Sequence, residues 1–186
     1  MAADRAFLHD LAKVGLIDGQ SASTHHYAHL KNGSQRSLNR LVSAGLLQAQ
    51  WLRFGDQRYL TYRFANAKVA QAFGAVLPGV GARCSLTHEW VSARLYFHLG
   101  RPRDFRLASQ FSERDLRLCG ELRPDAMYTD AHGETVFVEA DSGQYTKAQI
   151  RQKMSRWQGQ RQVWGQPAKA YAPIPASAPV TVVRIG

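Results

Sequence analysis

Cysteine, acidic side chains and long apolar runs are all scarce in this sequence. Its 186 residues include two cysteines, Cys84 and Cys119, whose contexts match neither a zinc site nor a disulfide framework, so we expect reduced packing thiols. No segment approaches the roughly eighteen consecutive apolar residues of a membrane helix, so no membrane partner is expected. The first residues do not have the pattern of a signal peptide, which favours a cytoplasmic protein.

Several kinds of chemistry also lack their usual signatures. We find no glycine-rich phosphate loop, no spacing typical of a nucleophilic triad and no internal repeat. What the sequence has in excess is positive charge, with 24 Lys and Arg against 14 Asp and Glu, a formal net charge of +10 and a pI near 10.1. Neutralising phosphates releases counterions and supplies most of the non-specific affinity for nucleic acid, so DNA is the expected partner.

The first 66 residues predict three helices followed by a hairpin. We expect Asp4 to open the first helix, Ser21 or Ser23 to cap the second, and Ser34 to cap a short third helix that stops at Gly45. The segments 46–54 and 57–64 then alternate at the strand period around a turn of glycine and aspartate. This order is typical of a winged-helix DNA-binding domain.

Polar side chains on the third helix and the hairpin are the candidate DNA contacts. Arginine reads guanine, asparagine and glutamine read adenine, and all of them also hold phosphates. The predicted DNA-binding residues are Ser34, Gln35, Arg36, Asn39, Arg40, Arg53 and Arg58. A winged helix that serves instead as a protein-interaction or dimerising module, for example in a homodimer, remains an open alternative.

The remaining sequence predicts a second domain. Residues 67–84 favour a short helix and a linker, and residues 85–186 then form the domain. A helix is expected over 85–99, ended by Gly100, and the apolar run 180–185 is typical of a strand. Together with the first domain this gives an α/β (α+β) protein with a central mixed sheet.

Acidic residues approach each other in a predicted hairpin of this second domain. Ala131, His132 and Gly133 form a three-residue loop in which Asp130 faces Glu134. Counting back along the strands places Asp125 opposite Glu139 and Arg123 opposite Asp141. Directly opposed side chains share one face of a sheet, and carboxylate oxygens suit a hard cation such as Mg2+ or Mn2+. The alternative is a solvated hairpin that carries surface acids.

These residues resemble the core of the PD-(D/E)xK nuclease superfamily. Pro124-Asp125 is followed by Glu139-Ala140-Asp141, with aspartate where the family has lysine. The resemblance implies that Asp125 and Glu139 are the metal ligands. Because Asp141 replaces the family's lysine, a lysine from another part of the chain would have to take its role. A predicted helix over 145–157 has Lys147 and Lys153 on its flanks, and either amine can reach the site, with Lys153 the preferred candidate. Asp141 would be a further ligand or would orient Arg123.

The sequence of residues 123–157, which contains this motif, is similar to that of the replication-relaxation proteins of plasmids and other mobile elements. That resemblance implies a winged helix joined to a nuclease-like core, and a role in replication, DNA relaxation or mobilisation. If the protein is catalytic, we expect Mg-dependent hydrolysis of phosphodiesters by Asp125, Glu139, Asp141 and Lys153. Two alternatives stay open: a catalytically silent accessory module that recruits a relaxase or replication protein, and a winged-helix transcription regulator.

Overall fold

The computed structural model describes residues 2–30, 33–75, 85–120 and 123–185. The chain divides into two compact units, Met1–Ala93 and Arg94–Gly186, and the division falls inside helix α5 (Leu86–His98). The predicted linker at 67–84 starts as a helix, α4 (Ala67–Ala72), and residues 76–84, with Cys84, lie outside the described part. Helices and sheets are mixed, which confirms the α/β class. None of the helices in the described ranges is long and apolar enough to cross a membrane.

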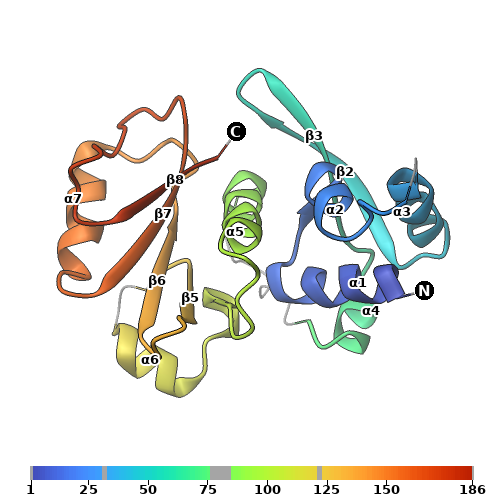
Figure 1. The fold of residues 1–186 in the computed structure, drawn as a ribbon, viewed down its shortest axis with the longest axis horizontal. Helices are drawn as coiled ribbons and strands as arrows, with labels where there is room; N and C mark the ends of the chain where they lie inside the picture. The colour runs from blue at the N-terminus through green and yellow to red at the C-terminus, as the bar shows by residue number, and fades with distance from the viewer. Residues whose placement is uncertain (1, 31–32, 76–84, 121–122, 186) are drawn as a thin grey trace. The chain divides into compact units, whose positions relative to one another are not determined.

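The first unit begins with the predicted three helices and hairpin (Figure 1). Its elements are α1 (Ala2–Val14), β1 (Ile17–Asp18), α2 (Gly19–His25), α3 (Gly33–Ser43), β2 (Leu47–Phe54), β3 (Gln57–Phe64) and α4. The strands form one antiparallel sheet in the order β1-β3-β2. Apolar residues at helical spacing in α1 and α3 are buried against it and form the core: Phe7, Leu8, Leu11, Leu38 and Leu41.

Three predicted helix starts in this unit are wrong. Helix α1 begins at Ala2, so Asp4 lies inside its first turn rather than opening it. Helix α2 begins at Gly19, because the Asp18 carboxylate accepts the backbone N–H of Ser21 and so satisfies an otherwise unpaired donor of the first turn. Helix α3 begins at Gly33, so Ser34 lies inside the first turn rather than at the N-cap. Asp18 also accepts the buried indole N–H of Trp90 at 2.9 Å, which ties the start of α2 to α5.

The β2–β3 hairpin follows the sequence prediction closely. Gly55 adopts a φ of 59°, as a two-residue turn between strands requires, and this pairs Arg53 directly with Arg58. The inner face of the hairpin carries Phe54 and Tyr59, whose rings lie 4.8 and 4.6 Å from the ring of Trp90. Figure 1 shows the hairpin as a long two-stranded arm that extends beyond α2 and α3.

The second unit is built on a five-stranded sheet of order β4-β5-β6-β7-β8. The strands β4 to β6 are antiparallel, and β6 to β8 are parallel. Its elements after α5 are β4 (Arg106–Leu107), the 3-10 turn Ala108–Gln110, α6 (Glu113–Cys119), β5 (Ala126–Thr129), β6 (Thr135–Ala140), α7 (Lys147–Arg156), β7 (Arg161–Pro167) and β8 (Thr181–Ile185). The predicted helices at 85–99 and 145–157 and the predicted strand at 180–185 correspond to α5, α7 and β8.

Helices pack on both faces of this sheet. On one face, α7 is fixed by the ring of Trp157, which follows its last residue and stacks on Phe137 with centroids 4.5 Å apart. On the other face, Leu95 of α5 lies so close to Gly165 that a Cβ there would meet its Cδ1 at 2.6 Å. Strand β7 was absent from the sequence prediction because Gly165 and Pro167 are both unfavourable in strands. In the structure, Gly165 leaves room for Leu95 of α5, and Pro167 is the last residue of the strand.

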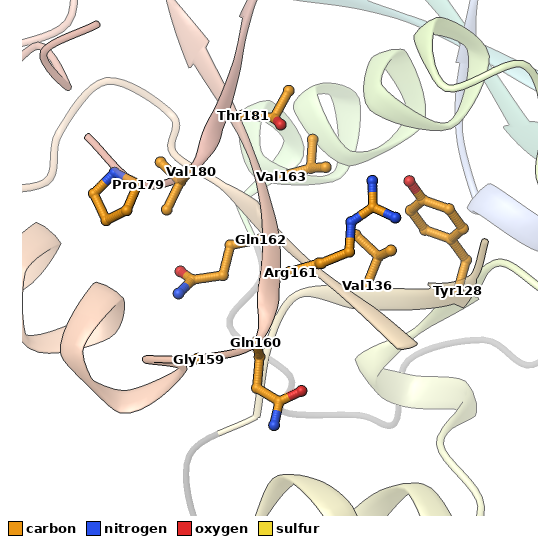
Figure 2. Close-up of a pocket in the computed structure, with 10 residues that line it drawn as sticks. All are labelled: Tyr128, Val136, Gly159, Gln160, Arg161, Gln162, Val163, Pro179, Val180 and Thr181. Atoms are coloured by element: carbon orange, nitrogen blue, oxygen red, sulfur yellow. The ribbon is translucent and has the colours of Figure 1, made fainter. Parts of the chain in front are cut away.

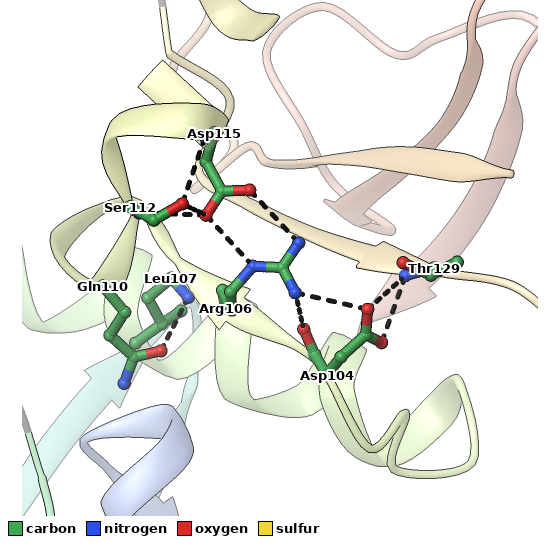
Figure 3. Close-up of polar contacts among 7 residues, drawn as sticks. All are labelled: Asp104, Arg106, Leu107, Gln110, Ser112, Asp115 and Thr129. Atoms are coloured by element: carbon green, nitrogen blue, oxygen red, sulfur yellow. Dashed lines mark hydrogen bonds and ion pairs between the residues drawn. The ribbon is translucent and has the colours of Figure 1, made fainter. Parts of the chain in front are cut away.

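Polar contacts around Arg106 connect the segment before β5 to the sheet (Figure 3). Arg106 lies between two carboxylates, with its Nη1 3.2 Å from Asp104 Oδ2 and its Nε 3.3 Å from Asp115 Oδ2. Asp115 also caps α6 with Ser112, and Asp104 accepts the backbone N–H of Thr129. The guanidinium attracts both carboxylates, so these contacts hold β4, α6 and β5 together.

Candidate metal site and nucleic-acid interface

The acidic hairpin has the predicted loop and register. Gly133 has a φ of 80°, the N–H of Asp130 donates to the Glu134 carbonyl at 2.9 Å, and Ala126 pairs with Val138. One step further along the strands, Asp125 immediately precedes β5 and Glu139 is the fifth residue of β6. The side chain of Asp125 reaches across to β6, where its Oδ2 accepts the backbone N–H of Ala140 at 2.7 Å. The hairpin therefore brings the two predicted carboxylates to the same place.

A lysine from helix α7 completes this arrangement. The Nζ of Lys153 lies 2.5 Å from Oε2 of Glu139, and the other carboxylate oxygen accepts the indole N–H of Trp157 at 3.3 Å. The Glu139 side chain is only 1% exposed, whereas that of Lys153 is 27% exposed. The same ammonium lies 5.1 Å from the ring centroid of Tyr145. Glu139 is thus enclosed, and the site reaches solvent on the side of Lys153.

The pKa values show that these groups share one electrostatic environment. Burial, followed by the negative charge of Asp125, raises the pKa of Glu139 to about 8, and the Lys153 ammonium opposes that rise. Burial by itself lowers the pKa of Lys153, but the charges of Asp125 and Glu139 outweigh it and raise that pKa. Burial and the charge of Asp125 raise the pKa of Tyr145 to about 12. Each shift depends on Asp125, so Asp125 is electrostatically coupled to all three groups.

The two candidate lysines have different positions. Lys153 contacts Glu139, while Lys147 is the first residue of α7 and is exposed to solvent. The helix begins where it does because Thr146 and Gln149 form a capping box. From that start, Ile150 and Lys153 are one helical turn apart, and Ile150 is buried against Trp164. Packing of Ile150 therefore turns Lys153 toward the sheet.

Asp141 is not brought into this cluster. Its Oδ1 accepts the backbone N–H groups of Gly143 and Tyr145, and its Oδ2 accepts the side-chain amide of Gln166 at 2.8 Å. Among the described residues, no group of three His, Cys, Asp or Glu side chains could hold a metal ion together. Asp141 is buried and shapes the loop that follows β6. Arg123, its predicted cross-strand partner, is exposed.

Two residues of the site were missed from the sequence. They are Trp157, whose indole N–H donates to Glu139, and Tyr145, whose ring lies beside the Lys153 ammonium. The available signal was spacing, because Trp157 lies one helical turn after Lys153 and shares its side of α7.

The donor set fits a magnesium ion in one specific way. Mg2+ is commonly held by one or two carboxylates, with water and substrate phosphate completing the shell. Asp125 and Glu139 provide such a pair. The Lys153 ammonium, however, contacts Oε2 of Glu139, so an ion bound to this oxygen would have to displace it or share the carboxylate with it. Holding a cation here thus requires a small movement of the lysine.

The predicted DNA-binding side chains are exposed except for Ser34, which is half-buried. Arg36 and Arg58 have no ion pair among the described residues, while Arg40 pairs with Asp4 of α1 at 2.6 Å. Gln35 donates to Asn39 at 2.8 Å along the exposed side of α3. Arg40 is thus partly committed to holding α3 on α1, and Arg36 is the arginine of this helix with its charge available.

A cavity of about 380 Å3 beside the start of β7 is separate from both candidate sites (Figure 2). Tyr128, Arg161 and Thr181 are among the residues that line it, and none of the predicted site residues does. Arg161 is held by ion pairs with Asp130 and Glu134 of the hairpin loop. The cavity has no acid–base pair of its own to suggest a reaction.

Comparison with known proteins adds no relative: no family model, curated protein or solved structure matches this chain.

Proposed function

We propose that this protein binds DNA through its first unit, as a winged helix, and that its second unit is a nuclease-like core of the PD-(D/E)xK type. In this proposal, Asp125, Glu139 and Lys153 serve Mg-dependent hydrolysis of a phosphodiester bond. The observation that carries it is the contact of Lys153 with Glu139 beside Asp125. In this proposal Lys153 of α7 supplies the amine that the motif has at position 141, where this sequence has aspartate.

The order of elements supports both parts of this proposal. Two helices, a third helix with exposed Gln35, Arg36 and Asn39, and a basic hairpin follow one another as in a winged helix. In the second unit, a helix precedes antiparallel β5 and β6, and α7 then leads to the parallel strand β7. The carboxylates lie where β5 starts and β6 ends. The helix that connects β6 to β7 can place a lysine at these strand ends.

The residues of the site have distinct roles in this chemistry. Asp125 and Glu139 would hold Mg2+, which when bound lowers the pKa of a water molecule and stabilises charge on phosphate. Lys153 places a positive charge on the accessible side of the pair, where it can orient the attacking water and stabilise the negative charge that develops on phosphate. Trp157 fixes the other oxygen of Glu139, so the carboxylate keeps one orientation. We further propose a cytoplasmic role in the replication or mobilisation of a plasmid or other mobile element.

One observation favours a second candidate. The Lys153 ammonium forms an ion pair with the carboxylate of Glu139, which is almost fully buried. A carboxylate pair stabilised in this way can serve as a structural ion pair in a silent nuclease-like fold. The protein would then be an accessory module that uses the first unit to bind DNA and the second to recruit a relaxase or replication protein.

Incubation with supercoiled plasmid separates the two candidates. We expect nicked or linear plasmid in the presence of Mg2+ or Mn2+ and intact plasmid in EDTA, as measured on an agarose gel. In both buffers the protein should retard linear DNA in a native gel, because retention depends on the first unit. Intact plasmid with normal retention in every metal would contradict the nuclease and leave the accessory module. Absence of retention would contradict DNA binding itself.

Replacing Arg36 and Arg58, which form no ion pair with any residue in the described ranges, tests the first unit. We expect Arg36→Ala combined with Arg58→Ala to weaken duplex binding. The magnitude of the slope of log affinity against log salt should fall by about 1 to 2, because fewer counterions are released when fewer phosphates are contacted. Fluorescence anisotropy over a salt series measures this. The control is Lys68→Ala, which removes an exposed charge from α4 in the same unit. Equal slopes for the wild type and the double variant would remove α3 and the hairpin from the interface.

A further inference from the structure

The hairpin of the first unit exposes a tryptophan that its fold does not use. The indole of Trp51 on β2 is 66% exposed, whereas Trp90, Trp157 and Trp164 are at most 5% exposed. These four are all the tryptophans of the chain. Trp51 is therefore the one tryptophan, all four being in the described residues, whose ring is open to a ligand.

Strand alternation defines the face on which Trp51 lies. Leu52 is buried and Phe54 packs on Trp90, so the even-numbered residues at this end of β2 point to the inner side. Trp51 and Arg53 therefore share the outer face. Across the hairpin they pair with Leu60 and Arg58 respectively. The outer face thus presents an indole followed by two directly opposed arginines toward the tip.

Toward the base of the hairpin this side of the sheet turns into the core. The next pair is Ala49, which is exposed, with Tyr62, which is buried and whose hydroxyl accepts the side-chain amide N–H of Gln35 at 3.4 Å. Gln35 in turn contacts Asn39. The exposed stretch of this side of the hairpin therefore runs from Ala49 through Trp51 to Arg53 and Arg58 at the tip, and we call it the outer hairpin face.

The charge of the outer hairpin face specifies the chemistry of its occupant. Of the three arginines in residues 47–64, Arg53 and Arg58 lie on this face, while Arg63 is on the inner side and pairs with Glu89. The single acid of this segment, Asp56, is in the turn. Opposed Arg53 and Arg58 repel each other unless an anion lies between or beside them. A polyanion that also offers a flat aromatic surface satisfies both features, and nucleic acid is such a ligand.

We propose that Trp51 stacks on an unpaired base, so that the DNA recognised by this protein contains a single-stranded segment or a junction between duplex and single strand. This inference rests on the DNA binding proposed above and specifies its substrate. In a continuous duplex the faces of the bases are already stacked on each other, and only an unpaired base offers its face to an indole. Arg53 and Arg58 would then hold the flanking phosphates, and the stacked ring would add to the affinity whatever the identity of the base.

Three labelled DNA probes test the proposal with the full-length protein: a blunt duplex, the same duplex with a single-stranded overhang, and the single strand. We expect Trp51→Leu to weaken binding of the overhang and single-strand probes about tenfold and that of the blunt duplex less than about twofold. Trp51→Phe, which keeps an aromatic face, should retain most of the affinity. Because the other tryptophans are buried, single-stranded DNA should also quench a component of the intrinsic fluorescence that Trp51→Phe lacks.

The outcomes are distinguishable. Equal weakening of all three probes, or no change in any of them, would overturn the stacking role while DNA binding stands. No binding of any probe by the wild type would remove the proposed DNA-binding function and this inference with it. A protein that is dimeric by light scattering, becomes monomeric on Trp51→Leu and keeps its DNA affinity would assign the outer hairpin face to a second copy of the chain and refute the proposal.

Discussion

Asp125→Asn is expected to reduce plasmid cleavage at least about 100-fold while DNA retention stays unchanged. The substitution removes the negative charge of the more accessible carboxylate, and the loss of a metal-ligand charge costs about 3 kcal/mol or more of transition-state stabilisation. The fold should survive, because an asparagine oxygen can still accept the N–H of Ala140 that now binds Oδ2. Initial rates of nicking, measured with Mg2+ and with Mn2+, give the size of the effect.

The matched control for this variant is Glu134→Gln on the same hairpin. Glu134 also loses a carboxylate charge in this change, but its side chain is 63% exposed and lies at the hairpin loop, away from Glu139. We expect cleavage within about twofold of the wild type, since a solvated charge at that position interacts weakly with the site. Cleavage by Asp125→Asn at the rate of this control would show that Asp125 takes no part in the reaction.

Lys153→Met is expected to destabilise the protein by about 3 kcal/mol at pH 8. Removing one partner of a buried ion pair leaves Glu139 either with an uncompensated buried charge or, because its pKa then rises further, with a proton that the unfolded state would release; in both cases the stabilisation from the ion pair is lost. The 27% exposure of Lys153 places the loss at the low end of the usual range. A methionine fills much of the same volume, so lost packing contributes little. Urea unfolding in EDTA, followed by far-UV circular dichroism, measures the change without any contribution from a bound cation.

The destabilisation by Lys153→Met should grow as the pH rises. The pKa of Glu139 is raised in the folded protein, from 4.5 to about 8, so the folded state binds this proton more tightly than the unfolded state does. A raised pKa contributes stability below 4.5 that is lost as the pH rises through the folded value. Both influences that lower this pKa come from Lys153, so the variant has a still higher folded pKa and a larger loss. We expect the difference from wild type to be smallest near pH 5 and to grow as the pH rises through and above about 8.

Two variants make this result specific. Lys147→Met removes an exposed lysine from the same helix and should leave stability within about 0.5 kcal/mol of wild type. Adding Glu139→Gln to Lys153→Met should restore most of the lost stability at pH 8, because no charge then remains buried at position 139. A Lys153→Met protein as stable as Lys147→Met at pH 8 would mean that Glu139 does not depend on this ammonium.

The sequence by itself determined the local elements and the register of the acidic hairpin. A glycine that tolerates positive φ, a short loop and flanking strand-forming residues leave one favourable pairing, and Asp125 and Glu139 come together as predicted. The same local rules predicted the β2–β3 hairpin and placed Arg53 and Arg58 beside its turn. They failed at the start of α2 and α3, where several polar residues in succession could each serve as the cap.

Only the tertiary structure decided which side chains complete the site. Lys147 and Lys153 differ little in sequence, and the packing of Ile150 and Trp157 against the sheet selects Lys153. Strand β7 also depends on tertiary contacts, because Gly165 has poor strand propensity and is accommodated through its close contact with Leu95. Local propensity is set by neighbours within a few residues, whereas helix orientation and exposure of Trp51 depend on which surfaces the assembled elements cover.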